Sequence, residues 1–227
     1  MNKQAFAKLL QSIGSNSFIS SKEKLKKTSI DLSGQKIESM EIKRLAEALE
    51  NNHTITDLDL SDNDIGIEEV SIIAALLEKN TTLTELDLSR NNINKDGAKH
   101  IASELAKNTA LVDLDLFHNN ISDAGAQFIA TALEKNNVLT GLDLSGNNIG
   151  DEGAKYLANA LKINTTLQEL DLSSNQIGNE GVKAFASALA VNYTLTDLDL
   201  MHNRISQEGA KIIVSFSTQC DVTVEFL

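Results

Sequence analysis

The 227-residue sequence contains no proline and no tryptophan, and only 4% of its residues are aromatic. A folded core must therefore consist mainly of aliphatic side chains, which a hydrophobic content of 41% makes possible. A single cysteine, Cys220, excludes an internal disulfide and favours a reducing compartment, so we expect a cytoplasmic location. No apolar run approaches the roughly 20 residues that span a bilayer. Lys8 and Gln11 interrupt the N-terminal segment and make it a poor secretory signal.

Basic residues are also scarce, with 20 Lys and Arg against 32 Asp and Glu, which gives a net charge of −12. This charge argues against nucleic acid or an anionic membrane as the partner, because both repel an acidic surface. A protein or peptide with a basic surface suits the charge better. The alternative is that the charge only keeps the protein in solution.

What the sequence does contain is repetition with a period of 28 residues. Each repeated asparagine ends the pattern L-x-x-L-x-L-x-x-N, except that the copy ending at Asn63 opens with Ile55, and a degenerate copy, IDLSGQKI, occupies residues 30–37. The repeated asparagines are Asn63, Asn91, Asn119, Asn147, Asn175 and Asn203. A fixed period of this length is typical of a solenoid.

Each repeat combines a strand pattern with a helix pattern. Leu86 and Leu88 alternate with acids, as in a strand with one buried face, and residues 98–105 carry apolar side chains at helical spacing. A second series of asparagines follows the predicted helices, and asparagine tolerates the left-handed conformation that ends many helices. We therefore expect left-handed helix ends at Asn52, Asn80, Asn108, Asn136, Asn164 and Asn192.

This pattern resembles the leucine-rich repeat family, in particular its ribonuclease-inhibitor-like class with a helix in every repeat, over residues 28–227. The resemblance implies an α/β solenoid shaped like a horseshoe, which binds proteins. Strands stack about 4.8 Å apart and helices about 10 Å apart, so the parallel sheet should line the concave face and the helices the convex face. The uniform repeat length, with one cysteine, departs from ribonuclease inhibitor itself.

The uniform array also resembles those of bacterial host-directed proteins, including proteins of Legionella-like intracellular bacteria. That resemblance implies an effector that is translocated into a host cell and acts on a host protein. A single repeat cannot bury its own apolar face, so the ends of the array need caps. We expect an N-terminal helical cap at residues 1–29, the 28-residue repeats at residues 30–217, and a C-terminal strand or cap at residues 218–227. We expect the protein to be a monomer.

Acidic side chains form two columns on the predicted concave face. One column is Asp31, Asp59, Asp87, Asp115, Asp143, Asp171 and Asp199. The other, two residues earlier, is Asp57, Glu85, Asp113, Gly141, Glu169 and Asp197. Like charges on neighbouring strands repel, and a cationic partner would relieve the repulsion. The alternative is that the aspartates only keep this face hydrated. Gly141 interrupts the second column and should leave a small opening for a partner side chain.

Two repeats depart from their siblings directly after the strand. Phe117 and His118, and likewise Met201 and His202, replace the serine and the small or charged residue found there in other repeats. A packing role should recur in every repeat, so we expect these four side chains to be exposed contact points for a partner. The alternative is neutral drift on a tolerant surface.

Motifs for catalysis are absent from the sequence. There is no P-loop, no dinucleotide-binding glycine motif and no HExxH zinc motif. His118 and His202 lie three repeats apart, too far to share one metal ion. We therefore expect no enzyme activity, no catalytic residues, no cofactor and no metal.

The sequence thus predicts a non-catalytic module that binds a protein through its acidic concave face. The partner-binding residues would be the acids of the two columns from Asp57 to Asp199, together with Phe117, His118, Met201 and His202. Two other functions remain open at this point: regulation of an enzyme, such as activation of a small GTPase, and a structural spacer.

Overall fold

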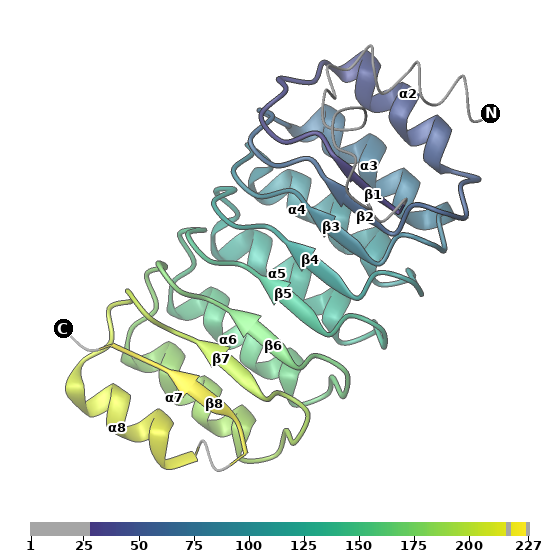
Figure 1. Ribbon diagram of the computed structural model, residues 1–227. Coiled ribbons are helices and arrows are strands. Elements are labelled where there is room, and N and C mark those ends of the chain that lie inside the picture. The colour runs from purple at the N-terminus through teal and green to yellow at the C-terminus, as the bar shows by residue number, and fades with distance from the viewer. Residues whose placement is uncertain (1–27, 217–218, 226–227) are drawn as a thin grey trace, which may run out of the picture.

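The computed structural model describes residues 28–216 and 219–225, in which eight strands alternate with seven helices (Figure 1). The strands are β1 (Ser29–Asp31), β2 (Asp57–Asp59), β3 (Glu85–Asp87), β4 (Asp113–Asp115), β5 (Gly141–Asp143), β6 (Glu169–Asp171), β7 (Asp197–Asp199) and β8 (Asp221–Thr223). The helices are α2 (Ser39–Leu49), α3 (Ile67–Lys79), α4 (Asn94–Leu105), α5 (Ser122–Leu133), α6 (Asp151–Leu161), α7 (Asn179–Leu189) and α8 (Gln207–Phe216). The predicted N-terminal cap falls almost entirely outside the described residues.

The eight strands form one parallel sheet in the order of the sequence. From β1 to β7 the pairing register equals the sequence period, so that Asp57 pairs with Glu85 and Glu85 with Asp113. Residues separated by one period therefore lie side by side on neighbouring strands. This register turns every repeated sequence position into a column across the sheet.

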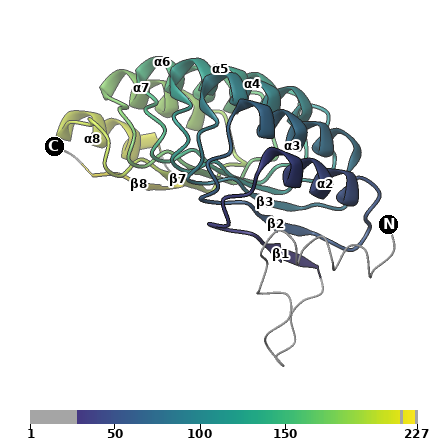
Figure 2. The same ribbon diagram turned by 90° about the horizontal axis from the view of Figure 1, so that it is seen from above.

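The helices pack beside one another in a second layer on one side of the sheet. Figure 2 shows this layer on the outer side of the arc and the strands on the inner side. Helices need a wider spacing than hydrogen-bonded strands, so a stack of such repeats must curve toward the sheet. The predicted leucine-rich repeat solenoid, with a parallel sheet inside and helices outside, is confirmed.

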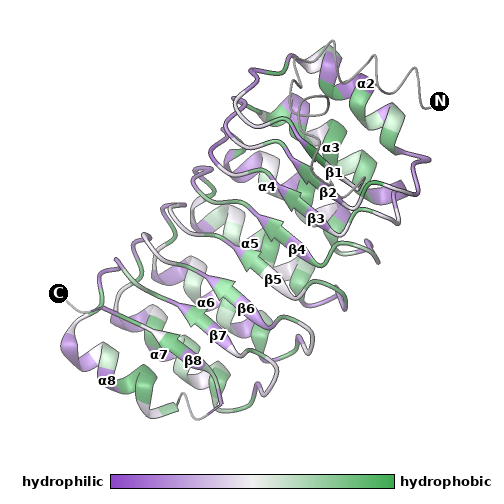
Figure 3. Ribbon diagram, viewed as in Figure 1, coloured by the Kyte–Doolittle hydropathy of each residue, from purple (hydrophilic) through white to green (hydrophobic). Residues whose placement is uncertain are grey.

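The core between the two layers is aliphatic. Leu88, Leu116 and Ile121 are fully buried, and the only aromatic residue of the described core, Phe185, is buried in α7. Figure 3 shows hydrophobic residues at matching points of successive repeats. Because each repeat buries its apolar face only against its neighbours, the stability of the array depends on stacking.

The repeated asparagines of the leucine pattern join the repeats inside the core. The side chain of Asn119 is fully buried, and its Nδ2 donates to the carbonyl oxygen of Leu88 at 2.8 Å, in the preceding repeat. Its Oδ1 accepts the N–H of Ile93 at 3.3 Å, and its own N–H donates to Oδ1 of Asn147 at 2.9 Å. These bonds satisfy backbone groups at the strand-to-helix turn that would otherwise be buried without a partner.

The second series of asparagines has a different role from the one that the sequence predicted. Asn80 has an extended backbone, with φ −80° and ψ 126°, so the expected left-handed helix end is wrong there. The members of the series are absent from the left-handed residues of the described chain. The Nδ2 of Asn136 instead donates to the carbonyl of Leu105 at 2.7 Å, and its Oδ1 accepts the N–H of Leu139 at 2.8 Å. From Asn80 to Asn192 this series is a second buried link between repeats.

One set of left-handed residues lies directly before the first asparagine series. These residues are Asp62, Arg90, His118, Gly146, Ser174 and His202, with φ between 54° and 65°. Gly146 adopts this conformation without steric cost, whereas it is disfavoured for residues that carry a side chain. Both histidines that the sequence singled out occupy this left-handed position, and both are exposed.

Candidate protein-binding surface

The structure brings the predicted acids together on the concave face. In β2 to β7 the central leucine points into the core, and the two positions beside it face the open side of the sheet. Toward the N-terminal end of the sheet these side chains surround a shallow hollow of about 300 Å³. We call it the acidic hollow; it is lined by Ser29, Asp57, Leu58, Asp59, Glu85, Leu86, Asp87, Asp113 and Asp115.

The aspartate that ends each strand has a structural role that the sequence analysis missed. Oδ1 of Asp115 accepts the backbone N–H of Phe117 at 2.8 Å. The same bond joins Asp59 to Ser61 at 2.9 Å and joins the equivalent residues of the other repeats. Each carboxylate thus holds the turn after its strand and is itself held in one orientation. The aspartates therefore do more than keep the face hydrated.

Burial and mutual repulsion change the acidity of this column. Burial raises the pKa of Asp115 to about 7, the hydrogen bond from Phe117 opposes the rise, and the carboxylates of Asp143, Asp87 and Asp113 add to it. Burial is also the main cause of the raised pKa values of Asp113, Asp143 and Asp199. At neutral pH the middle of the sheet therefore holds a proton in part of the molecules, and carries less negative charge than the formal count.

The opening expected at Gly141 does not exist. Gly141 is buried, and a Cβ atom added to it would overlap Oδ2 of Asp113 on the preceding strand. The Asp113 carboxylate occupies the space that the missing side chain leaves. The expectation of an entry point at this position was wrong, because a neighbouring side chain of the same sheet fills it.

Phe117 lies in a cluster contributed by three successive repeats, which we call the strand-end cluster: Arg90, Phe117, His118 and Gly146. The guanidinium carbon of Arg90 lies 4.8 Å from the centroid of the Phe117 ring, a cation–π contact. The His118 ring centroid lies 5.7 Å from that of Phe117. A Cβ atom at Gly146 would lie 3.0 Å from Cε2 of Phe117, so the glycine leaves room for the ring.

The exposure of this cluster differs in part from the expectation. Arg90 and His118 are exposed, but Phe117 and Met201 are half-buried rather than free-standing. Phe117 presents one part of its ring to solvent and packs the rest against neighbours. Arg90 was not among the predicted site residues. Arg90 occupies the position of His118 in the preceding repeat, just after the strand next to that of Phe117, and this position is the signal that could have identified it.

The second predicted pair, Met201 and His202, lies apart from the first. It follows β7, whereas Phe117 and His118 follow β4, with two strands between them. Nδ1 of His202 lies 3.0 Å from Oε2 of Glu225 just after β8. The structure therefore divides the four predicted contact residues between two places, and gives His202 a partner within the chain.

The described residues offer little for catalysis. No group of three or more His, Cys, Asp or Glu side chains in residues 28–216 and 219–225 has the arrangement of a metal site. Cys220 is a free, buried thiol, and burial, with the charges of Asp197 and Asp221, raises its pKa to about 11. It is therefore protonated at neutral pH and a poor nucleophile. None of the described helices is long and apolar enough to cross a membrane.

Comparison with known proteins shows what the chain is similar to. A model of the TMOD/LMOD leucine-rich domain matches residues 115–216, and a model of the leucine-rich repeat matches residues 51–68 and 79–102. A solved structure titled "Leiomodin-1 Actin-Binding Site 2 (ABS2)" is similar, with 28% sequence identity over 56% of this chain and 76% of that chain and a TM-score of 0.51. No curated protein matches the sequence. The chain is a leucine-rich repeat protein.

Proposed function

We propose that this chain is a non-catalytic protein-binding module and that its partner is actin. The observation that carries the proposal is the similarity to the leiomodin-1 actin-binding site, at 28% identity and with a TM-score of 0.51. The region matched by the TMOD/LMOD leucine-rich domain, residues 115–216, begins at Asp115 and includes Phe117, His118 and Gly146. The matched region therefore contains part of the proposed contact surface, whereas Arg90 and all the acids of the acidic hollow except Asp115 precede it.

The contact surface that we propose is the concave face together with the strand-end cluster. Hydrogen bonds to the backbone already fix the strand-end aspartates, so little conformational entropy is lost when a partner binds them. Their mutual repulsion falls when a Lys or Arg side chain of the partner enters the acidic hollow. At the edge of the sheet, Phe117 and Arg90 supply the aromatic and cationic groups that often dominate binding energy. A basic patch on the partner fits this arrangement.

The uniform 28-residue period supports a further proposal, that the protein is a bacterial effector. An array of this kind resembles those of host-directed bacterial proteins of the ribonuclease-inhibitor-like class. A translocated bacterial effector that binds actin would meet it in the cytoplasm of the host cell. We further propose that the protein acts there as a monomer, because a concave face covered by a second copy could not bind the partner.

A binding assay with purified actin tests the proposal. Immobilised wild-type chain should retain actin, and a variant with Asp87→Asn, Asp115→Asn and Asp143→Asn should lose most of it. The matched control replaces three exposed acids of the helical layer, Glu47, Glu78 and Glu134, with Gln and should retain actin as the wild type does. Failure of the wild type to retain actin would reject actin as the partner. Equal retention by the two variants would reject the concave face as the contact surface.

A further inference from the structure

The groove between helices α4 and α5, on the convex side, carries a charge opposite to that of the whole chain. It has a volume of about 340 Å³. Three lysines and no carboxylate line it, although the chain has a net charge of −12. We call it the lysine groove; its lining residues are Lys99, Ala102, Ser103, Ala106, Lys107, Phe128, Thr131, Ala132 and Lys135.

The lysine groove combines an apolar floor with a cationic rim. Ala102 and Ala132 are buried, and Phe128 packs against the core with part of its ring exposed. Nζ of Lys99 lies 5.7 Å from the centroid of the Phe128 ring. The floor thus offers apolar contact, and the aromatic ring holds one of the cations near it.

Two of the three lysines are available to a partner. Nζ of Lys107 lies 3.0 Å from Oε2 of Glu104, which neutralises it. Lys99 and Lys135 are exposed, and neither forms an ion pair with a carboxylate in the described part of the chain. They come from neighbouring repeats and lie on the two sides of one groove, so a single acidic segment can contact both.

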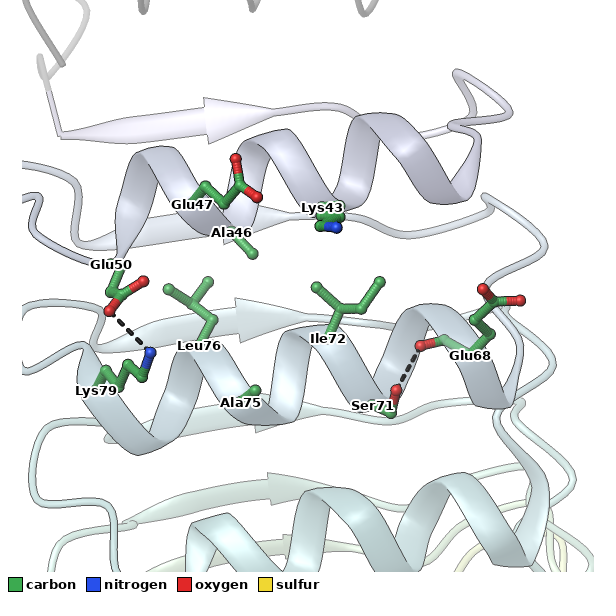
Figure 4. Close-up of a pocket in the computed structure, with 10 residues that line it drawn as sticks. All are labelled: Lys43, Ala46, Glu47, Glu50, Glu68, Ser71, Ile72, Ala75, Leu76 and Lys79. Carbon is green, nitrogen blue, oxygen red and sulfur yellow. Dashed lines mark hydrogen bonds and ion pairs between the residues drawn. The ribbon is translucent and has the colours of Figure 1, made fainter.

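The groove between α2 and α3, shown in Figure 4, is larger, at about 580 Å³, but both acids and lysines line it. Its Lys79 pairs with Glu50 at 2.9 Å, Glu47 and Lys43 line it from α2, and Glu68 lines it from α3. Three acids and two lysines therefore face a partner there. The lysine groove differs from it in the sign of its charge, and this difference indicates the chemistry of the partner.

We infer that the lysine groove is a second docking surface, which binds an acidic, amphipathic segment of a partner protein. Acidic side chains of the segment would pair with Lys99 and Lys135, and an apolar side chain would cover Phe128 and the alanine floor. An amphipathic helix laid in a groove between two helices is a recurring mode of recognition. A small anion would leave the apolar floor uncovered, so it fits the groove less well. The lysine groove lies on the layer opposite the sheet, and the inference stands independently of actin binding.

A peptide titration with the full chain tests this inference. The probe is a fluorescein-labelled peptide with Leu at positions i, i+3, i+4 and i+7 and Glu at the remaining positions; the comparison peptide carries Lys in place of Glu. The double variant Lys99→Glu with Lys135→Glu removes both cations. The matched control, Lys43→Glu with Lys162→Glu, makes the same change of charge at two exposed lysines outside the groove. Circular dichroism verifies that each variant is folded.

Fluorescence anisotropy should show saturable binding of the acidic peptide to the wild type, weakened by added salt. The Lys99/Lys135 variant should bind at least about tenfold more weakly, and the Lys43/Lys162 variant should remain within about twofold of the wild type. Phe128→Ala should also weaken binding, since it removes the aromatic part of the floor. Absence of saturable binding to the wild type, or an equal loss in the two double variants, would overturn the inference. Tighter binding of the Lys peptide would do so as well.

Discussion

The guanidinium carbon of Arg90 lies 4.8 Å from the centroid of the Phe117 ring and thereby joins two neighbouring repeats at the edge of the sheet. The following repeat contributes Gly146, whose missing side chain leaves room for the ring. Elsewhere in the array a serine usually takes the place of Phe117. Arg90, Phe117 and Gly146, which come from three successive repeats, thus form a local surface feature in an array of otherwise similar repeats.

Replacing Phe117 with serine, the residue found at this position in most other repeats, should weaken binding without unfolding the chain. The variant Phe117→Ser removes the ring that contacts Arg90, and we expect it to weaken actin binding about tenfold or more. The cost in stability should stay near 1 kcal/mol, because the side chain is only half-buried. Titration with actin and a thermal melt measure the two effects. The control is Val191→Ser, which removes an exposed apolar side chain elsewhere. An equal loss of actin binding in this control would show that Phe117 has no specific role in binding.

The substitution Asn119→Ala should destabilise the array strongly. It removes donors to Leu88 and Leu116 and the acceptor for Ile93, and leaves these backbone groups buried without partners. We expect a loss of about 2 to 4 kcal/mol in the free energy of unfolding, measured with urea. The exposed Asn137, changed to Ala, should lose less than about 0.5 kcal/mol. Equal losses in the two variants would show that the buried asparagines do not hold the repeats together.

The raised pKa of Asp115 predicts that the stability of the fold depends on pH. The native state binds this proton more tightly than the unfolded state, so this group lowers stability as the pH rises from about 4 to about 7. Asp115→Asn keeps the Oδ1 acceptor for the Phe117 N–H and removes the charge. We expect it to raise the free energy of unfolding by about 1 to 2 kcal/mol at pH 8, an advantage that disappears near pH 4.

Urea unfolding across this pH range measures the difference between Asp115→Asn and the wild type. Asp59→Asn, at a strand end with the same type of hydrogen bond, controls for the loss of one carboxylate from the column. Parallel pH profiles of the wild type and Asp115→Asn would contradict the assignment of this titration to Asp115.

An acid at position 141, where glycine interrupts the acidic column, should destabilise the fold. In the variant Gly141→Asp the new side chain would overlap the Asp113 carboxylate, and a second negative charge would join a partly buried group. We expect a loss of about 1 to 3 kcal/mol in the free energy of unfolding at pH 7.5. Introducing Asp113→Ala into the same chain should recover most of the loss, because it vacates the space. If Gly141→Asp alone were neutral, the space beside Gly141 would be open after all.

The repeat period was sufficient to predict the solenoid, the parallel sheet and the columns across it. A constant spacing of 28 residues places Asp57 beside Glu85 in any stacked array, whatever the details of the loops. The period also predicted which residues face the concave side, because the strand alternation is the same in every repeat.

Other features depend on side-chain geometry that the period does not encode. The carboxylate of Asp113 fills the space beside Gly141 because it turns toward the next strand, which no sequence pattern records. The tolerance of asparagine for the left-handed conformation predicts such a backbone at Asn80, but hydrogen bonds to its side chain favour an extended one. The repeat pattern does not predict the lysine groove, because Lys99 and Lys135 occupy different positions of their repeats and meet only across two packed helices.

The most direct test of the central claim is the dissociation constant of the full chain for purified actin at low and at moderate salt. We predict saturable binding that salt weakens and that the Asp87→Asn, Asp115→Asn and Asp143→Asn variant weakens further at low salt, because charge on the concave face contributes to affinity. No saturable binding to actin at either salt concentration, or an affinity that neither salt nor these substitutions change, would contradict it.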